Sequence, residues 1–267
     1  MGVEIVGYIL AVVVGLSLGM VGSGGSILTV PILVYVMAVD PVTATAYSLF
    51  VVGVTSLVGA LQNALNKRVD YKTAIIFGIP SILAVYVTRA FLMPLIPDVL
   101  FNLGKLTFTK SMGLMVLFAI VMILAAFSMF RPCKDCEESE EIKIRYNYPL
   151  ILAEGILVGI LTGLVGAGGG FLIIPALVLL AGMPMKLAVG TSLFIIAAKS
   201  LLGFIGDIQV NEVINWGLLS LFTGLSVVGI FVGNYISGNV PGDKLKRFFG
   251  VFILIMGIYI LIKELLQ

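Results

Sequence analysis

The stretch GMVGSGGSILTVPILV, residues 19–34, places a cluster of glycines inside a long apolar region. A closely similar stretch, GLVGAGGGFLIIPALV, occupies residues 163–178. One glycine inside a helix costs about 1 kcal/mol relative to alanine, so several together interrupt the helix. The two stretches therefore predict two breaks in apolar helices, each followed by a short apolar segment.

The composition indicates where these helices lie. Of the 267 residues, 60% are hydrophobic and 11% are charged, and the mean hydropathy is +1.17. Soluble domains carry about 25% charged residues. The composition therefore predicts a multi-pass protein of the cell membrane, with the lipid bilayer as its surroundings. The net charge of +2 gives no indication of a nucleic-acid partner.

Several kinds of chemistry are excluded by the residues that the sequence lacks. The chain has no histidine, which excludes Ser-His and Cys-His nucleophile pairs and His-ligated metals. Cys133 and Cys136 form one Cys-x-x-Cys, which favours two loop cysteines without a mechanistic role and leaves open a redox pair or a metal site shared between subunits. No nucleotide-binding G-x-x-x-x-G-K-[ST] motif occurs. The sequence therefore predicts no cofactor, no resident metal and no enzyme.

The chain divides into two similar halves. At an offset of 144 residues the glycines and the proline of the first stretch coincide with those of the second. We predict an all-α membrane protein with a first repeat at 1–130, a polar linker loop at 131–148 and a second repeat at 149–267. About 8–10 membrane segments are expected, including short interrupted or re-entrant segments after the glycine-rich breaks.

The loop charges favour inverted repeats. The connector at 66–72 carries three basic residues, whereas the equivalent connector carries Asp207 and Glu212 and no Lys or Arg. Cytoplasmic loops are enriched in Lys and Arg, so equivalent loops of opposite bias are expected on opposite sides of the membrane. Lys105 and Lys110 oppose this assignment.

Interrupted helices in inverted repeats are typical of transporters, in which half-helix N-termini face anionic groups. The first N–H groups of a helix lack intrahelical partners and bind anions. The sequence therefore predicts a substrate site at the two breaks. Its members are Gly22, Ser23, Gly24, Gly25 and Ser26 in the first half, and Gly166, Gly168, Gly169 and Gly170 in the second.

The longer segment that follows each short apolar segment carries polar residues on one face. Ser48 occupies this face in the first half, and Ser192 and Lys199 occupy it in the second. A lysine in an apolar segment requires a cavity, a carboxylate or a bound anion. We expect Lys199 to contact a substrate anion. An ion pair with Glu154 or Asp207 and snorkelling to the interface are the alternatives.

Arg89 raises the same question closer to a segment end. It lies in the sequence AVYVTRAF, and its position is compatible with snorkelling and with a functional role.

The paired GxxGxGG…P clusters, each followed by a (T/Y)SLF…S helix, resemble the sulfite exporter TauE/SafE family of membrane permeases. The second copy has the fuller form of the motif, with Thr191 beside Ser192, and Thr191 joins the candidate substrate-binding residues. The first copy has Tyr47 before Ser48. The resemblance implies transport of small sulfur-containing oxyanions or organosulfonates, such as sulfite, sulfoacetate or thiosulfate.

These observations predict a secondary transporter of small anions that are held near the membrane midplane. An anion channel or a small-molecule membrane sensor is the alternative function. A proton or sodium ion is the candidate coupling ion, with Glu154 as a carboxylate placed to carry a proton. The sequence leaves open the direction of transport and the oligomeric state.

Overall fold

The computed structural model describes residues 2–103, 106–130, 148–179, 183–208, 214–237 and 242–266. Nearly all of these residues are helical, as the sequence predicts. Cys133, Cys136 and all but the last residue of the predicted linker lie outside the described residues.

The first half begins with α1 (Gly2–Val21) and then tightens into a 3-10 turn, η1 (Gly22–Leu28). The chain continues through α2 (Thr29–Pro31), η2 (Ile32–Val36), α3 (Pro41–Leu65), α4 (Tyr71–Val87), η3 (Thr88–Leu92) and α5 (Met93–Leu95). A hairpin of β1 (Val99–Leu103) and β2 (Leu106–Thr109) leads into α6 (Lys110–Phe130). The hairpin is the one departure from the predicted all-α fold among the described residues.

The second half repeats this order with fewer interruptions. Its helices are α7 (Tyr148–Val165), α8 (Gly170–Leu179), α9 (Met185–Ile208), α10 (Trp216–Ser237) and α11 (Gly242–Leu265). The breaks at 22–28 and 166–169 therefore fall where the glycine clusters predict them.

Among the residues that the structure describes, five helices are long and apolar enough to cross a membrane. They cover residues 41–65, 71–95, 110–127, 187–208 and 216–236, and shorter apolar helices cover 4–20, 25–36 and 151–165. The protein is therefore a multi-pass membrane protein, and many large apolar side chains on its outer surface are exposed because lipid covers such a surface in place of water.

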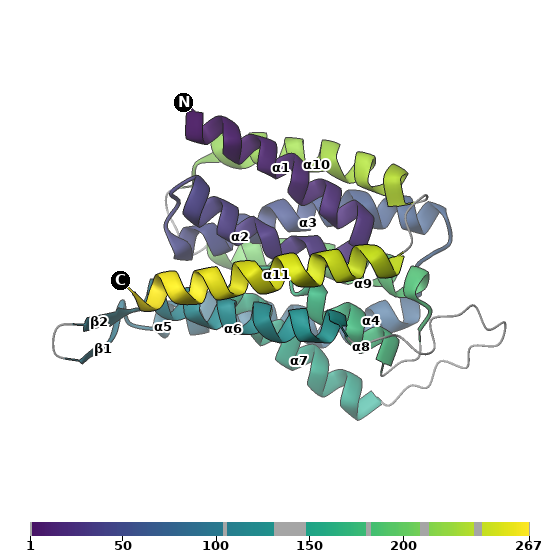
Figure 1. Ribbon diagram of the computed structural model, residues 1–267. Coiled ribbons are helices and arrows are strands. Elements are labelled where there is room, and N and C mark those ends of the chain that lie inside the picture. Colours follow the sequence, from purple (N-terminus) through teal and green to yellow (C-terminus); the bar gives the residue numbers. More distant parts are fainter. Residues whose placement is uncertain are drawn as a thin grey trace.

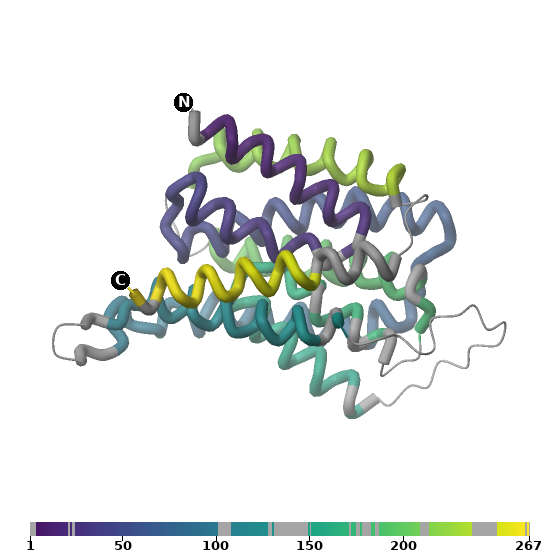
Figure 2. The backbone as a smooth tube through the Cα atoms, in the orientation of Figure 1, coloured from purple at the N-terminus to yellow at the C-terminus, as the bar shows by residue number. Residues whose placement is uncertain are grey.

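The helices of the two halves pack against each other. α1 lies against α10, α4 against α7, α3 against α9 and α6 against α11. In Figure 1, α1 begins and α11 ends at the left of the bundle, whereas α6 ends and α7 begins toward the right. The tube in Figure 2 follows the same path. The first half therefore starts and finishes at opposite ends of the bundle.

Glycines let these helices approach closely, as the small-residue spacing predicts. A Cβ on Gly15 of α1 would collide with the backbone of Ser226 in α10. A Cβ on Gly159 of α7 would collide with the backbone of Ser81 in α4. Gly159 is the counterpart of Gly15 at the offset of 144, so the same contact occurs twice with the halves exchanged.

Candidate functional site

The second break has a backbone that only glycine adopts easily. α7 ends at Val165, and φ is 73° at Gly166, 66° at Gly168 and 61° at Gly169. Residues with a Cβ rarely adopt these positive values. The chain then enters α8 at Gly170. In the first break Gly22 has φ 71°, but the following residues form the 3-10 turn η1.

The two breaks lie against each other where α3 and α9 pack together. A Cβ on Gly168 would lie 2.6 Å from Val52 Cγ1 of α3, 3.3 Å from Ile196 Cγ2 of α9 and 3.5 Å from Ser26 Cβ of η1. Ser26 is fully buried. The two glycine clusters, far apart in the sequence, thus meet inside the bundle.

Lys199 lies beside the second break. Its side chain is fully buried, and Nζ donates a hydrogen bond to Thr162 Oγ1 of α7 at 3.1 Å. A Cβ on Gly169 would lie 2.8 Å from Nζ and would also collide with Thr162 Oγ1. Gly169 therefore leaves the space in which the lysine of α9 and the threonine of α7 meet.

The structure gives Lys199 no carboxylate partner among the described residues. Asp207 is engaged by Arg89 instead, with Nη1 and Oδ1 3.3 Å apart. Glu154 lies eight residues before Thr162 on α7, a rise of about 12 Å along the helix. The ion pair considered for Lys199 is therefore not found, and its complete burial contradicts snorkelling.

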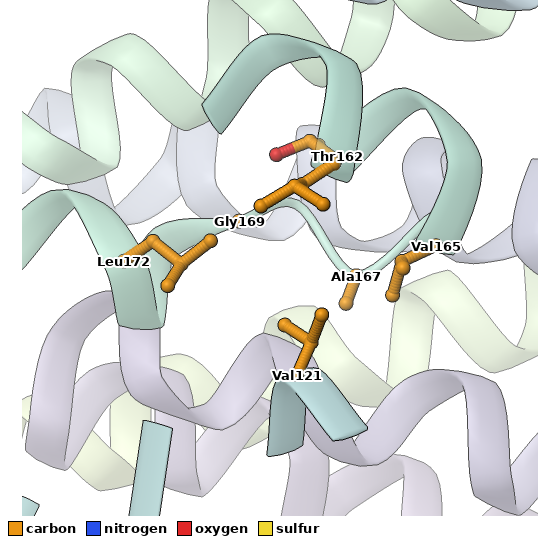
Figure 3. Close-up of a pocket in the computed structure, with 7 residues that line it drawn as sticks. Val121, Thr162, Val165, Ala167, Gly169 and Leu172 are labelled. Atoms are coloured by element: carbon orange, nitrogen blue, oxygen red, sulfur yellow. The ribbon is translucent and has the colours of Figure 1, made fainter. Parts of the chain in front are cut away.

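A narrow crevice adjoins this group of residues (Figure 3). Thr162, Gly169 and Ala167 of the α7–α8 region face Val121 of α6 and Leu172 of α8 across it. Leu161 and Val165 complete the lining, which is apolar apart from the Thr162 hydroxyl. The crevice is too narrow for a water-sized sphere. Entry of an ion would therefore require α6, α7 and α8 to separate.

The other predicted site residues of the second half have varied surroundings. Thr191 Oγ1 accepts a hydrogen bond from the Asp70 backbone N–H at 2.9 Å, which fixes the start of α4. Ser192 Oγ donates to Val189 O of its own helix at 2.8 Å. A Cβ on Gly166 would collide with Thr45 of α3, so Gly166 also has a packing role.

The predicted site residues of the first half are glycines and serines, none of which carries a charge. Ser48 Oγ is buried and has no hydrogen-bond partner among the described residues. A Cβ on Gly22 would contact Val189 of α9, and a Cβ on Gly25 would collide with Ser17 of α1. Ser23 and Gly24 belong to η1, but their side-chain surroundings are outside what the structure describes.

The sequence analysis did not predict two contacts of this region, the one between Thr162 and Lys199 and the one between Arg89 and Asp207. Thr162 has no distinguishing pattern, because a threonine in an apolar helix usually bonds to its own backbone. Arg89 and Asp207 did carry a signal, since each is a charge of opposite sign in or beside an apolar segment. Arg89 is 1% exposed, so the snorkelling considered for it is wrong.

Comparison with known proteins assigns the chain to a family. The model of a family described as "Sulfite exporter TauE/SafE" matches residues 8–260. The chain belongs to this family. The family and the relatives below are described as membrane transporters, so this TauE/SafE member is a membrane transporter and not an enzyme.

The relatives agree with this assignment. A "Probable membrane transporter protein" of Xylella fastidiosa is 27% identical over 252 residues, which cover 93% of this chain and 91% of the relative. The "Probable membrane transporter protein YunE" of Bacillus subtilis is 31% identical over 239 residues, which cover 78% and 81%. No solved structure matches the chain.

Proposed function

We propose that this TauE/SafE transporter is a secondary carrier of small sulfur-containing oxyanions or organosulfonates, which it holds at the second glycine break. One observation carries the proposal: the buried ammonium of Lys199 lies beside Thr162 and Gly169 with no carboxylate partner among the described residues. The alternatives of an anion channel and a membrane sensor are outcomes of the test below.

The positive charges near the second break favour binding of an anion. In its protonated form Lys199 is positive, and α8 begins at Gly170, one residue after the glycine that Lys199 contacts. The N-terminus of a helix carries about half a positive charge. A charged lysine at the bilayer centre costs about 2.5–3.5 kcal/mol on insertion scales. Two positive features that meet in a buried place are stabilised together by one bound anion.

Thr162 adds a donor suited to an oxyanion. Its Oγ1 accepts the hydrogen bond from Lys199, so its own hydroxyl hydrogen is available to the substrate. An anion between Lys199 and the start of α8 would therefore receive hydrogen bonds from an ammonium and a hydroxyl, beside the positive end of α8. Sulfite, thiosulfate and sulfonates present several oxygens at short spacing, which suits adjacent donors, and the family description favours the same class.

The two halves, residues 1–130 and 149–267, are proposed to be inverted repeats. Two observations support this: contacts recur with the halves exchanged, and the first half starts and finishes at opposite ends of the bundle (Figure 1). An odd number of crossings per repeat gives such an arrangement. Inverted repeats allow alternating access around a central site, which favours a carrier over a channel.

Uptake into proteoliposomes tests the proposal. Purified protein is reconstituted, and accumulation of sulfite, thiosulfate and sulfoacetate is measured against chloride and acetate, with and without proton or sodium gradients. We expect saturable transport of at least one sulfur anion and weak transport of chloride and acetate. Non-saturating currents would favour the channel, binding without flux would favour the sensor, and transport of acetate alone would contradict the substrate class.

A further inference from the structure

A second buried cation lies nearer the end of the bundle. Arg89 belongs to η3, a wide turn inside the apolar span of residues 71–95. Such wide turns within helices are frequent at functional sites. Asp207 is the residue before the last one of α9. It lies eight residues beyond Lys199, a rise of about 12 Å along the helix.

Helices α3, α7 and α9 pack around Arg89 and its neighbour Thr88. A Cβ on Gly206 of α9 would lie 3.2 Å from Arg89 Cβ, and a Cβ on Gly163 of α7 would lie 2.7 Å from Thr88 Cβ. Thr45 of α3 accepts a hydrogen bond from Arg89 Nη1 at 3.1 Å. Glycines on two helices thus give η3 the room to direct Arg89 inward, where it is shielded from lipid.

The hydrogen bonds of this group use only part of the guanidinium. Nη1 donates both to Thr45 Oγ1 and to Asp207 Oδ1. Among the described residues, Arg89 Nε and Nη2 and Asp207 Oδ2 have no hydrogen-bond partner, although all three atoms are buried. Nε and Nη2 form one edge of the planar group, which is the edge that binds two oxygens of an oxyanion side by side.

We propose that this free edge of Arg89 is a second oxyanion subsite of the transporter, and that Asp207 is a tethered counter-ion that competes with the substrate for it. The proposal rests on the anion transport proposed above and adds a second binding position nearer the end of α9. A purely structural ion pair would be expected to use both carboxylate oxygens, because unpaired buried donors and acceptors are costly.

The other half shows that packing alone does not require these charges. Asn234 of α10 occupies the position of Arg89, and Gln62 of α3 lies one residue before the position of Asp207. Asn234 Nδ2 donates a hydrogen bond to Gln62 Oε1. Asn234 corresponds to Arg89 at an offset of 145 residues, and Gln62 corresponds to Gly206, the neighbour of Asp207, at 144. Two neutral amides therefore make the equivalent helix contact in the other half. The charges of Arg89 and Asp207 are not needed for packing alone.

Binding of sulfite, kept under anaerobic conditions, tests the proposal in purified protein carrying Asp207→Asn, Arg89→Lys or Arg89→Gln. The matched control is Asn234→Ala, which alters the equivalent contact of the other half. Removing the competitor in Asp207→Asn should tighten sulfite binding by about 10-fold and slow its release, and Arg89→Lys should weaken binding by about 10-fold because the fork is lost. Asn234→Ala should leave affinity near the wild-type value.

The double variant Arg89→Gln, Asp207→Asn keeps the proposal testable if a single variant leaves an unpaired charge and fails to fold. It resembles the neutral pair of the other half, so it should fold and should bind sulfite more weakly than wild type. Wild-type affinity in the double variant, or weakened or unchanged affinity in Asp207→Asn, would overturn the subsite. Absence of sulfite binding in wild-type protein would instead count against the proposed substrate class, and with it the subsite.

Discussion

The two glycine breaks occupy equivalent places in the two halves, yet their surroundings differ. At the first break Gly25 lies against Ser17, whose hydroxyl donates to Val14 O of its own helix at 2.7 Å. At the second break Gly169 lies against Thr162 and Lys199. The residue that corresponds to Lys199 in the first half is Thr55.

Thr55 needs no ligand to satisfy its hydroxyl group. Its Oγ1 donates to Val51 O within α3 at 2.6 Å, so the group is satisfied locally. Among the described residues Lys199 has no acceptor within its own helix, and its hydrogen bond reaches Thr162 of α7. The two halves therefore share their helix packing but differ in the polar groups at the break. Helix contacts depend on residue size, whereas ion binding depends on charge.

The largest expected effect comes from removing the charge that distinguishes the halves. Lys199→Ala should reduce transport by about 100-fold, the effect of losing a charge-assisted hydrogen bond of about 3 kcal/mol. Its melting temperature should be equal or higher, because a buried charge without a carboxylate partner is removed. Thr55→Ala, at the equivalent position, should transport normally. A folded Lys199→Ala protein with wild-type uptake would contradict the assignment.

A methyl group at the second break should come next. Gly169→Ala places a Cβ against Lys199 Nζ and Thr162 Oγ1 at a positive φ. Strain in this backbone region costs about 1–2 kcal/mol per residue, so we expect a lower melting temperature and strongly reduced uptake. Gly224→Ala is the matched control, because a Cβ on Gly224 of α10 meets nothing within 4 Å. Equal effects of the two substitutions would indicate general fragility of the helices.

Removing the hydroxyl beside Lys199 should have an intermediate effect. Thr162→Val keeps the shape and loses the acceptor of the 3.1 Å hydrogen bond. Loss of one hydrogen bond of about 1 kcal/mol predicts an increase of about 5-fold in the sulfite concentration for half-maximal uptake. Ser17→Ala, which removes a hydroxyl of the first half, should leave this concentration unchanged. The opposite pattern would place the anion at the first break.

The smallest expected effect on transport concerns Thr191, which sequence reasoning assigns to the substrate site. Its hydroxyl accepts from the Asp70 N–H, and Tyr47 OH accepts from the Asn215 N–H at 2.6 Å in the other half. Thr191→Ala and Tyr47→Phe should each change stability by about 1 kcal/mol or less and leave sulfite affinity unchanged. Weakened sulfite binding in folded Thr191→Ala would restore Thr191 to the site.

Much of this arrangement could be predicted from residues close together in the sequence. The glycine clusters locate both breaks, because several adjacent glycines disfavour a continuous helix, and Lys199 is conspicuous as a charge within an apolar segment. The family resemblance, the transporter assignment and the multi-pass membrane topology are confirmed.

The remainder depends on contacts between distant segments. Arg89 and Asp207 are 118 residues apart, and Lys199 and Thr162 are 37 apart on different helices. These residues meet because glycines allow α4, α7 and α9 to approach closely. The periodicity of residues within one helix gives no information on such contacts between helices. The β1–β2 hairpin was missed because its two strands are short and lie in the connector between two apolar segments.

Locating a bound anion tests the central claim most directly. Crystals grown with selenite, an analogue of sulfite, give an anomalous selenium signal that marks the anion without reliance on activity. We expect a peak beside the start of α8, placed so that the selenite oxygens lie within hydrogen-bonding distance of Lys199 Nζ and the Thr162 hydroxyl. A peak confined to the first break near Ser26, or no peak inside the bundle at selenite concentrations that saturate competition with sulfite uptake, would contradict it.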